Sequence, residues 1–335
     1  MNRSALLFVL FGVAASALFV VNIVCGSIHI PIESIMDVLS GCDDGSIYRN
    51  IVLEMRLPQA VTALLSGAAL AAAGLILQTV FQNPLADPSI LGVNSGASLG
   101  VAIVMLALGG SVVTMGTSIS GFLLVVVAAF VGAFVIIALL LFFSHRVKNN
   151  FTLLIVGIMI SFVTSSLISL LNYCATEQGV HSYIMWGLGN FGGVGMKSLP
   201  LYAGAMAVCI FLSIMLLKPL NAMLLGANYA ENLGINIKAA RTWLIIVTGL
   251  ISAVVTAFCG PISFIGLAVP HMARMISRTV NHRTLLPLTL LIGATLGLLC
   301  NWLCTLPPDG TLIPLNVITP LFGVPVILYV LLARK

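Results

Sequence analysis

Charged residues are scarce in this sequence, and this scarcity is the first guide to the class of the protein. Only 7% of the 335 residues are Asp, Glu, Lys or Arg, whereas 60% are hydrophobic, and the mean hydropathy is +1.18. About a quarter of the residues of a soluble domain are charged. So few charges cannot cover a surface that faces water, so the composition predicts an all-α polytopic membrane protein.

Motifs for converting energy within the chain are also lacking. The sequence has no G-x-x-x-x-G-K-[ST], which excludes nucleotide binding through a P-loop. It has no pair of carboxylates inside an apolar run, although proton or sodium coupling relies on ionisable groups within the bilayer. These absences argue against a stand-alone channel or a proton-coupled secondary transporter. They favour a non-catalytic permease that a partner drives.

Cysteine patterns of a metal or redox site are missing as well. The seven cysteines include no C-x-x-C pair, and Cys300 and Cys304 lie inside an apolar run, where they are expected to be small buried hydrophobes. Cys42 and Cys174 fall in predicted outer loops, so a disulfide between them remains one of two alternatives. The sequence predicts no metal site and no cofactor bound by this chain.

What the sequence does contain is a series of apolar segments close to the ~20 residues that cross a bilayer. We predict ten spans, at roughly 5–27, 57–81, 90–109, 117–143, 152–173, 199–217, 242–259, 262–277, 285–304 and 313–332. A signal peptide is the alternative for the first, but the run is too long and lacks a small-residue cleavage site.

The distribution of Lys and Arg tests this topology, since both favour the cytoplasmic side. With ten spans and a cytoplasmic N-terminus, three basic residues lie outside: Arg49, Arg56 and Lys197. Eleven lie inside: Arg3, Arg146, Lys148, Lys218, Lys238, Arg241, Arg274, Arg278, Arg283, Arg334 and Lys335. If segment 262–277 did not cross, five of the eleven would move outside and the split would become 6 to 8. Ten spans with both termini in the cytoplasm fit better.

Two of the segments run into breaks that carry Gly and Pro. These are "QNPLADPSILG" (82–92) and "GPISFIGLAVPH" (260–271). Their helix–break–helix patterns start on opposite sides of the membrane, which predicts two inverted halves, a layout common in transporters. Small residues in the second segment, Gly67, Ala68, Ala71 and Gly74, predict tight helix packing.

Three other features leave alternatives open. The connection 218–241 has apolar residues at helical spacing, so it is either a partner-binding element or a solvated linker. Tyr183 and Trp186, in the outer connection 174–198, either stack on a cargo or anchor the chain at the membrane interface. His271 is expected to be structural rather than a metal or haem ligand, because no second ligand is spaced to join it.

Several long motifs closely resemble permeases of the FecCD type, subunits of binding-protein-dependent ABC importers for iron–siderophores, haem and vitamin B12. In chain order they are "RLPQAVTALLSGAALAAAGLILQTVFQNPLADPSILGVNSGAS" (56–98), "YIMWGLGNFGGV" (183–194), "LLGANYAENLGINIKAAR" (224–241), "SFIGLAVPHMARMI" (263–276) and "NHRTLLP" (281–287). The resemblance covers essentially the whole chain.

The resemblance implies a type II ABC importer permease fold of ten helices in a bacterial inner membrane. It implies a homodimer with the pathway along the dimer axis, two partner ATPase subunits that bind ATP and Mg, and an extracytoplasmic binding protein. No nucleic-acid partner is expected. An iron complex, such as a ferric siderophore, is the expected cargo, with vitamin B12 or haem as alternatives.

The resemblance also implies roles for individual residues. The cytoplasmic gate falls on Asn83, Pro84, Leu85, Asn149 and Asn150, and the ATPase-coupling loop falls on Gly226, Ala230, Glu231, Leu233 and Gly234. Arg56 is expected to meet the binding protein. The chain departs from the family's R-x-P-R pattern, because Gln59 replaces the second arginine, and Cys304, Thr305 and Leu306 stand where relatives carry another.

Overall fold

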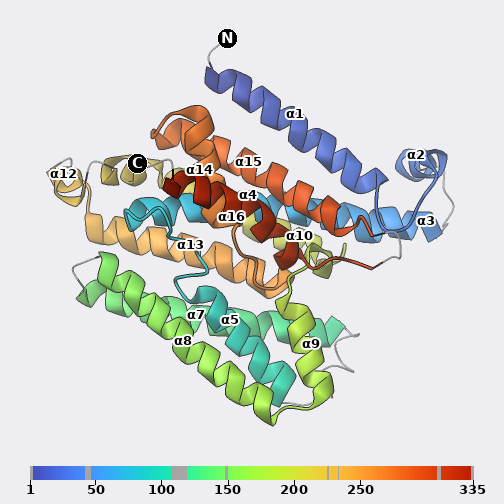
Figure 1. The fold of residues 1–335 in the computed structure, drawn as a ribbon, viewed down its shortest axis with the longest axis horizontal. Coiled ribbons are helices and arrows are strands. Elements are labelled where there is room, and N and C mark those ends of the chain that lie inside the picture. The colour runs from blue at the N-terminus through green and yellow to red at the C-terminus, as the bar shows by residue number, and fades with distance from the viewer. Residues whose placement is uncertain are drawn as a thin grey trace.

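The computed structural model describes residues 3–41, 47–107, 119–147, 150–224, 226–232, 234–307 and 311–332. Throughout these ranges the chain forms helices joined by short connections, without a β-strand (Figure 1). The helices are α1 (Arg3–Val24), α2 (Ile32–Ser40), α3 (Ile47–Arg49), η1 (Asn50–Arg56), α4 (Leu57–Val80), α5 (Val93–Ala102), η2 (Ile103–Ala107), α7 (Ile119–Arg146), α8 (Asn150–Cys174), α9 (Glu177–Gly187), η3 (Phe191–Gly193), α10 (Leu199–Met215), α11 (Leu217–Met223), α12 (Ala227–Asn232), α13 (Ile237–Cys259), α14 (Ile265–Ser277), α15 (His282–Cys304) and α16 (Leu315–Leu332).

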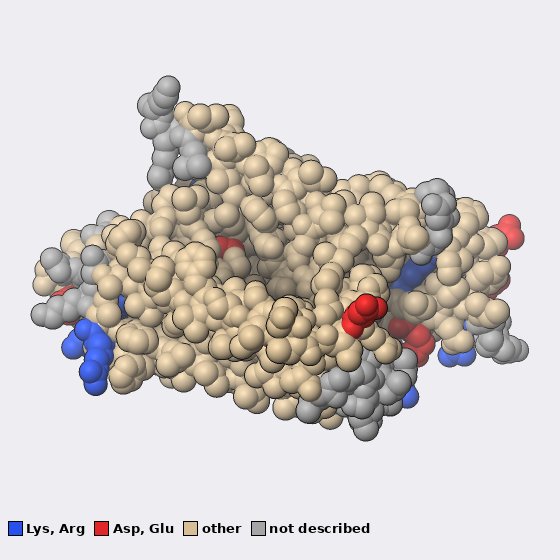
Figure 2. All heavy atoms as spheres, turned by 60° about the horizontal axis from the view of Figure 1, so that its bottom comes forward, with Lys and Arg blue, Asp and Glu red and all other residues tan. Residues whose placement is uncertain are grey.

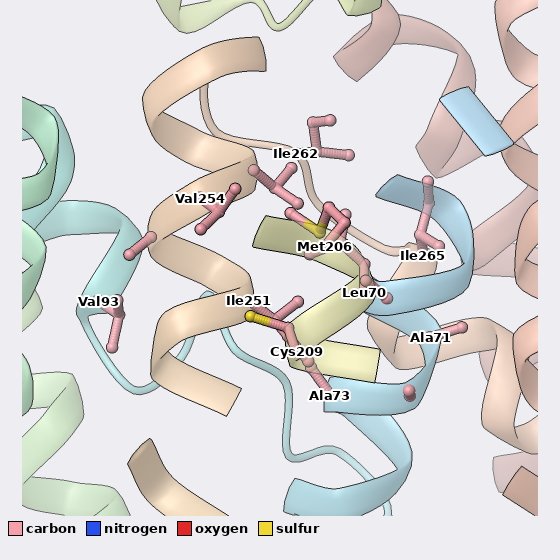
Figure 3. Close-up of a cluster of buried hydrophobic side chains, with 14 of the residues drawn as sticks. Leu70, Ala71, Ala73, Val93, Met206, Cys209, Ile251, Val254, Ile262 and Ile265 are labelled. Carbon is pink, nitrogen blue, oxygen red and sulfur yellow. The ribbon is translucent and has the colours of Figure 1, made fainter. Parts of the chain in front are cut away.

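Helix α4 forms the centre of the bundle. It is buried along almost its whole length, between α15, α14, α13 and α10, while α5, α7 and α8 form a group on one side (Figure 1). Buried side chains of α4, α10 and α13 point towards one another, among them Leu70, Met206 and Ile251 (Figure 3). A helix that is apolar all round suits this position because it has no polar face to keep in water.

The small residues of α4 meet small residues of its neighbours, which confirms the expected tight packing. A Cβ atom at Gly67 would overlap the backbone of Gly293 and Gly297 on α15. A Cβ at Gly74 would overlap the backbone of Gly266 on α14. Glycine on both sides therefore allows direct backbone contact, as at other helix crossings in membranes.

Large apolar side chains are exposed on the outside of the bundle, on α1, α7, α8 and α16. Examples are Leu10, Phe134, Phe162 and Leu328, each about half exposed. Figure 2 shows one face that is mostly uncharged and hollowed near its middle, with most Lys and Arg groups towards its two ends and an Asp or Glu group visible beside the hollow. A face of this kind suits contact with lipid or with a second membrane subunit rather than with water.

Each of the ten predicted segments contains a helix, but the helices differ in their capacity to span a membrane. In the part of the chain that the structure describes, six are long and apolar enough: those over Arg3–Val24, Ile47–Val80, Gly121–Arg146, Phe151–Cys174, Ile237–Cys259 and His282–Cys304. Helices α10 and α11 pass this test together, with a bend of 48° between them. Val93–Ala107 and Leu315–Val330 are shorter, and α14 has only 13 residues. The number of crossings stays a prediction.

The two ends of the bundle differ in charge, and we name them accordingly. The basic end holds the connection from α4 to α5, helices α11 and α12, and the start of α15, with Lys218, Lys238 and Arg283. The acidic end holds α2, η1 and the start of α9, with Glu33, Glu54 and Glu177.

The backbone contact at Gly74 leads to a first prediction. In Gly74→Ala the added methyl group would have to displace the α14 backbone, so we expect a loss of about 1–3 kcal/mol of stability. Gly204→Ala on α10 is the matched control, because no atom lies within 4 Å of the added Cβ. Thermal unfolding of both variants in the same detergent measures the difference. Equal midpoints would contradict the packing account.

Candidate functional site

The connection from α4 to α5 contains three of the predicted gate residues. Gln82 has a left-handed backbone (φ 47°), and the side chain of Asn83 accepts a hydrogen bond from the Leu85 N–H at 2.9 Å. Leu85 is 39% exposed, whereas Ala86 and Asp87 are buried. The connection therefore has an exposed tip, 82–85, and a second half that turns back into the bundle.

The other two gate predictions fall in part outside the described residues. Asn149 lies outside them, and Asn150 is the first residue of α8. The structure therefore places Asn83, Pro84 and Leu85 on one tip.

His271 holds this tip against α14. Its Nε2 atom donates a hydrogen bond to the Pro84 carbonyl oxygen at 2.7 Å, and the side chain is buried. Among the described residues no group of three His, Cys, Asp or Glu side chains is arranged to hold a metal ion. The structural role expected for His271 agrees with this geometry.

Asp87 carries a carboxylate into the interior beyond the tip. One carboxylate oxygen accepts hydrogen bonds from the backbone N–H and the hydroxyl of Ser89, and the other faces Gly266 of α14. Loss of hydration on burial raises the pKa of Asp87, and the two bonds from Ser89 oppose this rise.

The two predicted helix breaks meet at a polar cavity of about 400 Å³. Ser89 comes from the first break, and Pro261 and Ser263 come from the second. Six serines line it, at positions 89, 95, 98, 165, 169 and 263, together with Asn94, Ile168 and Tyr183. None of these lining residues carries a charge. A cavity of this size is in the range of small-molecule sites, and its groups offer only hydrogen bonds.

Neighbouring helices hold the lining of this serine cavity in place. Asn94 of α5 accepts hydrogen bonds from Ser252 and Thr256 of α13. Tyr183 of α9 stacks on Trp186 with ring centroids 6.1 Å apart and lines the cavity, which favours the cargo-contact alternative for Tyr183. These serines were not predicted from the sequence, although Ser165 and Ser169 are one helical turn apart and share a face of α8.

The predicted coupling segment lies at the basic end. Helix α12 ends in a Schellman motif: Gly234 N–H donates to the Glu231 carbonyl at 2.8 Å, and Ile235 N–H donates to the Ala230 carbonyl at 3.1 Å. Gly234 takes the left-handed conformation that this motif needs (φ 79°). Ala230 is buried, Glu231 is exposed, and Leu233 lies outside the described residues.

A second cavity, of about 700 Å³, opens beside this segment. Its lining includes Lys218 and Asn221 from the region of α11, Ile235, and Asn281 and Arg283 from the start of α15. The cavity therefore combines a positively charged rim with apolar walls, which suits contact with another protein.

Arg56 differs from its predicted docking role. Its side chain is only 7% exposed. Nη1 donates to the carbonyl oxygens of Ile23 and Val24 at 2.9 and 2.8 Å, and Nη2 donates to that of Ile28. Arg56 thus satisfies carbonyls at the end of α1 rather than projecting from the surface, because these groups have no partner within the helix.

Gln59 is also turned inwards. It donates to Asn301 at 2.9 Å, and Asn301 donates to Asn22 at 2.7 Å. This chain of amides links α4, α15 and α1 near the acidic end. A binding protein would therefore not meet Arg56 as an exposed cation, and Gln59 is both uncharged and turned inwards.

Asp87 gives a pH prediction. Because folding raises its pKa, the folded state gains stability in acid, and this contribution is lost as the pH rises through the folded-state pKa. We therefore expect Asp87→Asn to be more stable than the wild type at pH 7 and to lose that advantage towards about pH 4.

Thermal midpoints measured across this pH range test the prediction. Asp37→Asn is the control, because Asp37 is exposed at the acidic end. If the difference between Asp87→Asn and the wild type does not depend on pH, the account of Asp87 is wrong.

Comparisons with known proteins identify the family. The FecCD transport family matches residues 13–333. The chain is 35% identical to the vitamin B12 import system permease protein BtuC of Salmonella typhi over 282 residues, 84% of this chain and 83% of the relative. It is 34% identical to the ABC transporter permease protein YvrB of Bacillus subtilis (strain 168), over 99% of this chain and 95% of the relative.

Two solved transporter structures are also similar to this chain. An inward-facing transporter described as of the metal-chelate ABC type has a TM-score of 0.82 and 28% identity, with 99% of each chain covered. PsaBC from Streptococcus pneumoniae, with a TM-score of 0.53 and 15% identity over 88% of this chain and 94% of that one, shares the fold. The chain therefore belongs to the FecCD transport family and is a permease subunit of an ABC importer, in which a separate chain hydrolyses ATP.

Proposed function

We propose that this permease imports a corrinoid of the vitamin B12 type through a pathway that includes the serine cavity. The observation that carries the proposal is the uncharged, hydrogen-bonding lining where the two helix breaks meet. Broken helices at the meeting of two repeats form the substrate path in many transporters. A lining without fixed charge holds a large cargo weakly enough to release it.

The chemistry of the lining helps to choose the cargo. A corrinoid presents many carboxamide groups, which match serine hydroxyls and the Asn94 amide. Haem carries two carboxylates, for which this lining offers no cation. The similarity to BtuC favours the corrinoid. A ferric siderophore is the second candidate, and the similarity to a transporter of the metal-chelate type favours it.

The proposed assembly follows the family. Two copies of this chain form the pathway, two ATPase subunits contact the basic end at α11 and α12, and a binding protein contacts the acidic end. The basic end faces the cytoplasm, as the excess of Lys and Arg there favours, and both chain termini lie on that side. Native mass spectrometry of the assembled complex distinguishes a homodimer of this chain from a heterodimer with a different permease.

A transport assay tests the cargo. In vesicles with the ATPase and the binding protein, we expect ATP-dependent uptake of cyanocobalamin. We expect Ser169→Trp to reduce it at least about tenfold, because the indole fills a cavity the size of a ligand site. Ser166→Trp, on the same helix but outside the lining, is the matched control.

Two results would count against this assignment. Uptake of a ferric siderophore but not of cyanocobalamin would select the second candidate. Concentrative uptake without the ATPase would contradict an ATP-driven importer.

The coupling role of the segment 226–235 yields a separate prediction. Gly234→Val places a β-branched residue at a left-handed position and should unravel the end of α12. We expect ATP hydrolysis to persist while the rate of uptake falls at least about tenfold, a rise of about 1.4 kcal/mol or more in the activation free energy of transport.

Gly41→Val provides the control. Gly41 has nearly the same backbone (φ 75°) and open space around it, but it ends α2 at the acidic end. Normal uptake by Gly234→Val, or an equal defect in Gly41→Val, would refute the coupling role.

A further inference from the structure

Buried and half-buried polar side chains at the basic end form a path from α11 to the tip 82–85. The path begins at Asn221, which lines the cavity beside the coupling segment. The Asn221 Oδ1 atom accepts the His282 backbone N–H at 2.8 Å, which identifies this atom as the oxygen. The Nδ1 atom of the His282 ring lies 3.1 Å from the same oxygen and therefore donates its proton to it.

His282 connects α11 to α4. The side chain is fully buried, and its Nε2 atom lies 2.9 Å from the hydroxyl oxygen of Thr79 in the last turn of α4. Asn281, the N-cap of α15, accepts a further hydrogen bond from the Asn221 amide at 3.2 Å. The start of α15 is thus tied to α11 on one side and to α4 on the other.

The path continues from α4 to α14 and then to the tip. Gln78, next to Thr79, accepts a hydrogen bond from Arg274 at 2.6 Å and donates to the Leu267 carbonyl at 3.2 Å. One turn before Arg274, His271 donates to the Pro84 carbonyl. The path from Asn221 to Pro84 therefore consists of hydrogen bonds and two links along a helix, from Thr79 to Gln78 and, over one turn, from Arg274 to His271.

We propose that this path positions the tip 82–85 in response to movement of α11, with His282 and His271 as positioning residues. The inference rests on the coupling role proposed above and on the gate role that the family resemblance implies for the tip. Its physical basis is that a buried donor or acceptor that loses its partner costs free energy. A displacement of α11 must therefore either carry His282 and α4 with it or break buried bonds, so the path favours concerted movement.

Labelling of an engineered thiol tests this path without any cargo. Leu85→Cys, in a background with Cys25, Cys42 and Cys174 changed to serine, reports the exposure of the tip to a maleimide. The complete complex with its ATPase is placed in lipid nanodiscs. The labelling rate is compared without nucleotide and with ATP and vanadate, and the difference between the two rates is the signal.

We expect His282→Leu and Thr79→Val to reduce this difference in labelling rate about fivefold. A fivefold change corresponds to about 1 kcal/mol, which is the net contribution of one buried hydrogen bond. His282→Gln should restore much of it, since an amide can both donate and accept. Thr289→Val on α15 is the matched control, because within the described residues the buried Thr289 hydroxyl makes one hydrogen bond, to the Leu285 carbonyl one turn back, at 2.7 Å. It should keep the full difference.

The possible outcomes are distinguishable. If the wild type shows no difference, the proposed gate fails, and the path fails with it. If the wild type shows the difference and His282→Leu keeps it, or Thr289→Val loses it as well, only the path is refuted.

A double variant, Thr79→Val with His271→Leu, adds a further condition. If the two residues belong to a single path, the double variant should lose less of the difference in labelling rate, on a free-energy scale, than the two single variants lose together. Additive losses would overturn the single path.

Discussion

Backbone contact between α4 and its two neighbours, α14 and α15, is the constraint on which the rest of the structure depends. At Gly67 and Gly74 no side chain separates the helices, so the axes approach closely and their relative register is fixed. Because Gly266 is the second residue of α14, the same contact places His271 and Arg274 beside the last turns of α4. The position of the tip 82–85 therefore follows from a contact about two helical turns away.

Most polar groups of the described interior follow a second rule, that buried polar atoms need partners. Amides and hydroxyls satisfy one another in the chain from Gln59 to Asn22 and in the bonds from Ser252 and Thr256 to Asn94. The serine cavity differs because its hydroxyls also line open space: those of Ser89, Ser169 and Ser263 donate to protein acceptors, and their oxygen lone pairs face the cavity as acceptors. Groups that can bond to a passing molecule are thus concentrated where the two helix breaks meet.

The sequence predicted the parts of this architecture that depend on composition and local pattern. The helices, the break after α4 and the small residues at Gly67 and Gly74 all follow from apolar runs, prolines and glycine spacing. The orientation of Arg56 does not, because it depends on where the end of α1 lies in space. The serine cavity was missed for the same reason, since its lining comes from segments more than 70 residues apart, such as Ser89 and Ser165. Family motifs located the tip and the end of α12, but only the structure shows the bonds that join α11 to α4.

The inward-turned Arg56 also bears on how the protein enters the membrane. A guanidinium at the start of a long apolar helix is costly to bury unless acceptors are at hand. Its acceptors are carbonyls of Ile23, Val24 and Ile28, which leave the ribosome about thirty residues earlier. The first helix is therefore already present when Arg56 arrives at the translocon. The acceptor carbonyls are thus synthesised before the charged Arg56 side chain, and α1 and α4 are suited to partition into lipid as a pair.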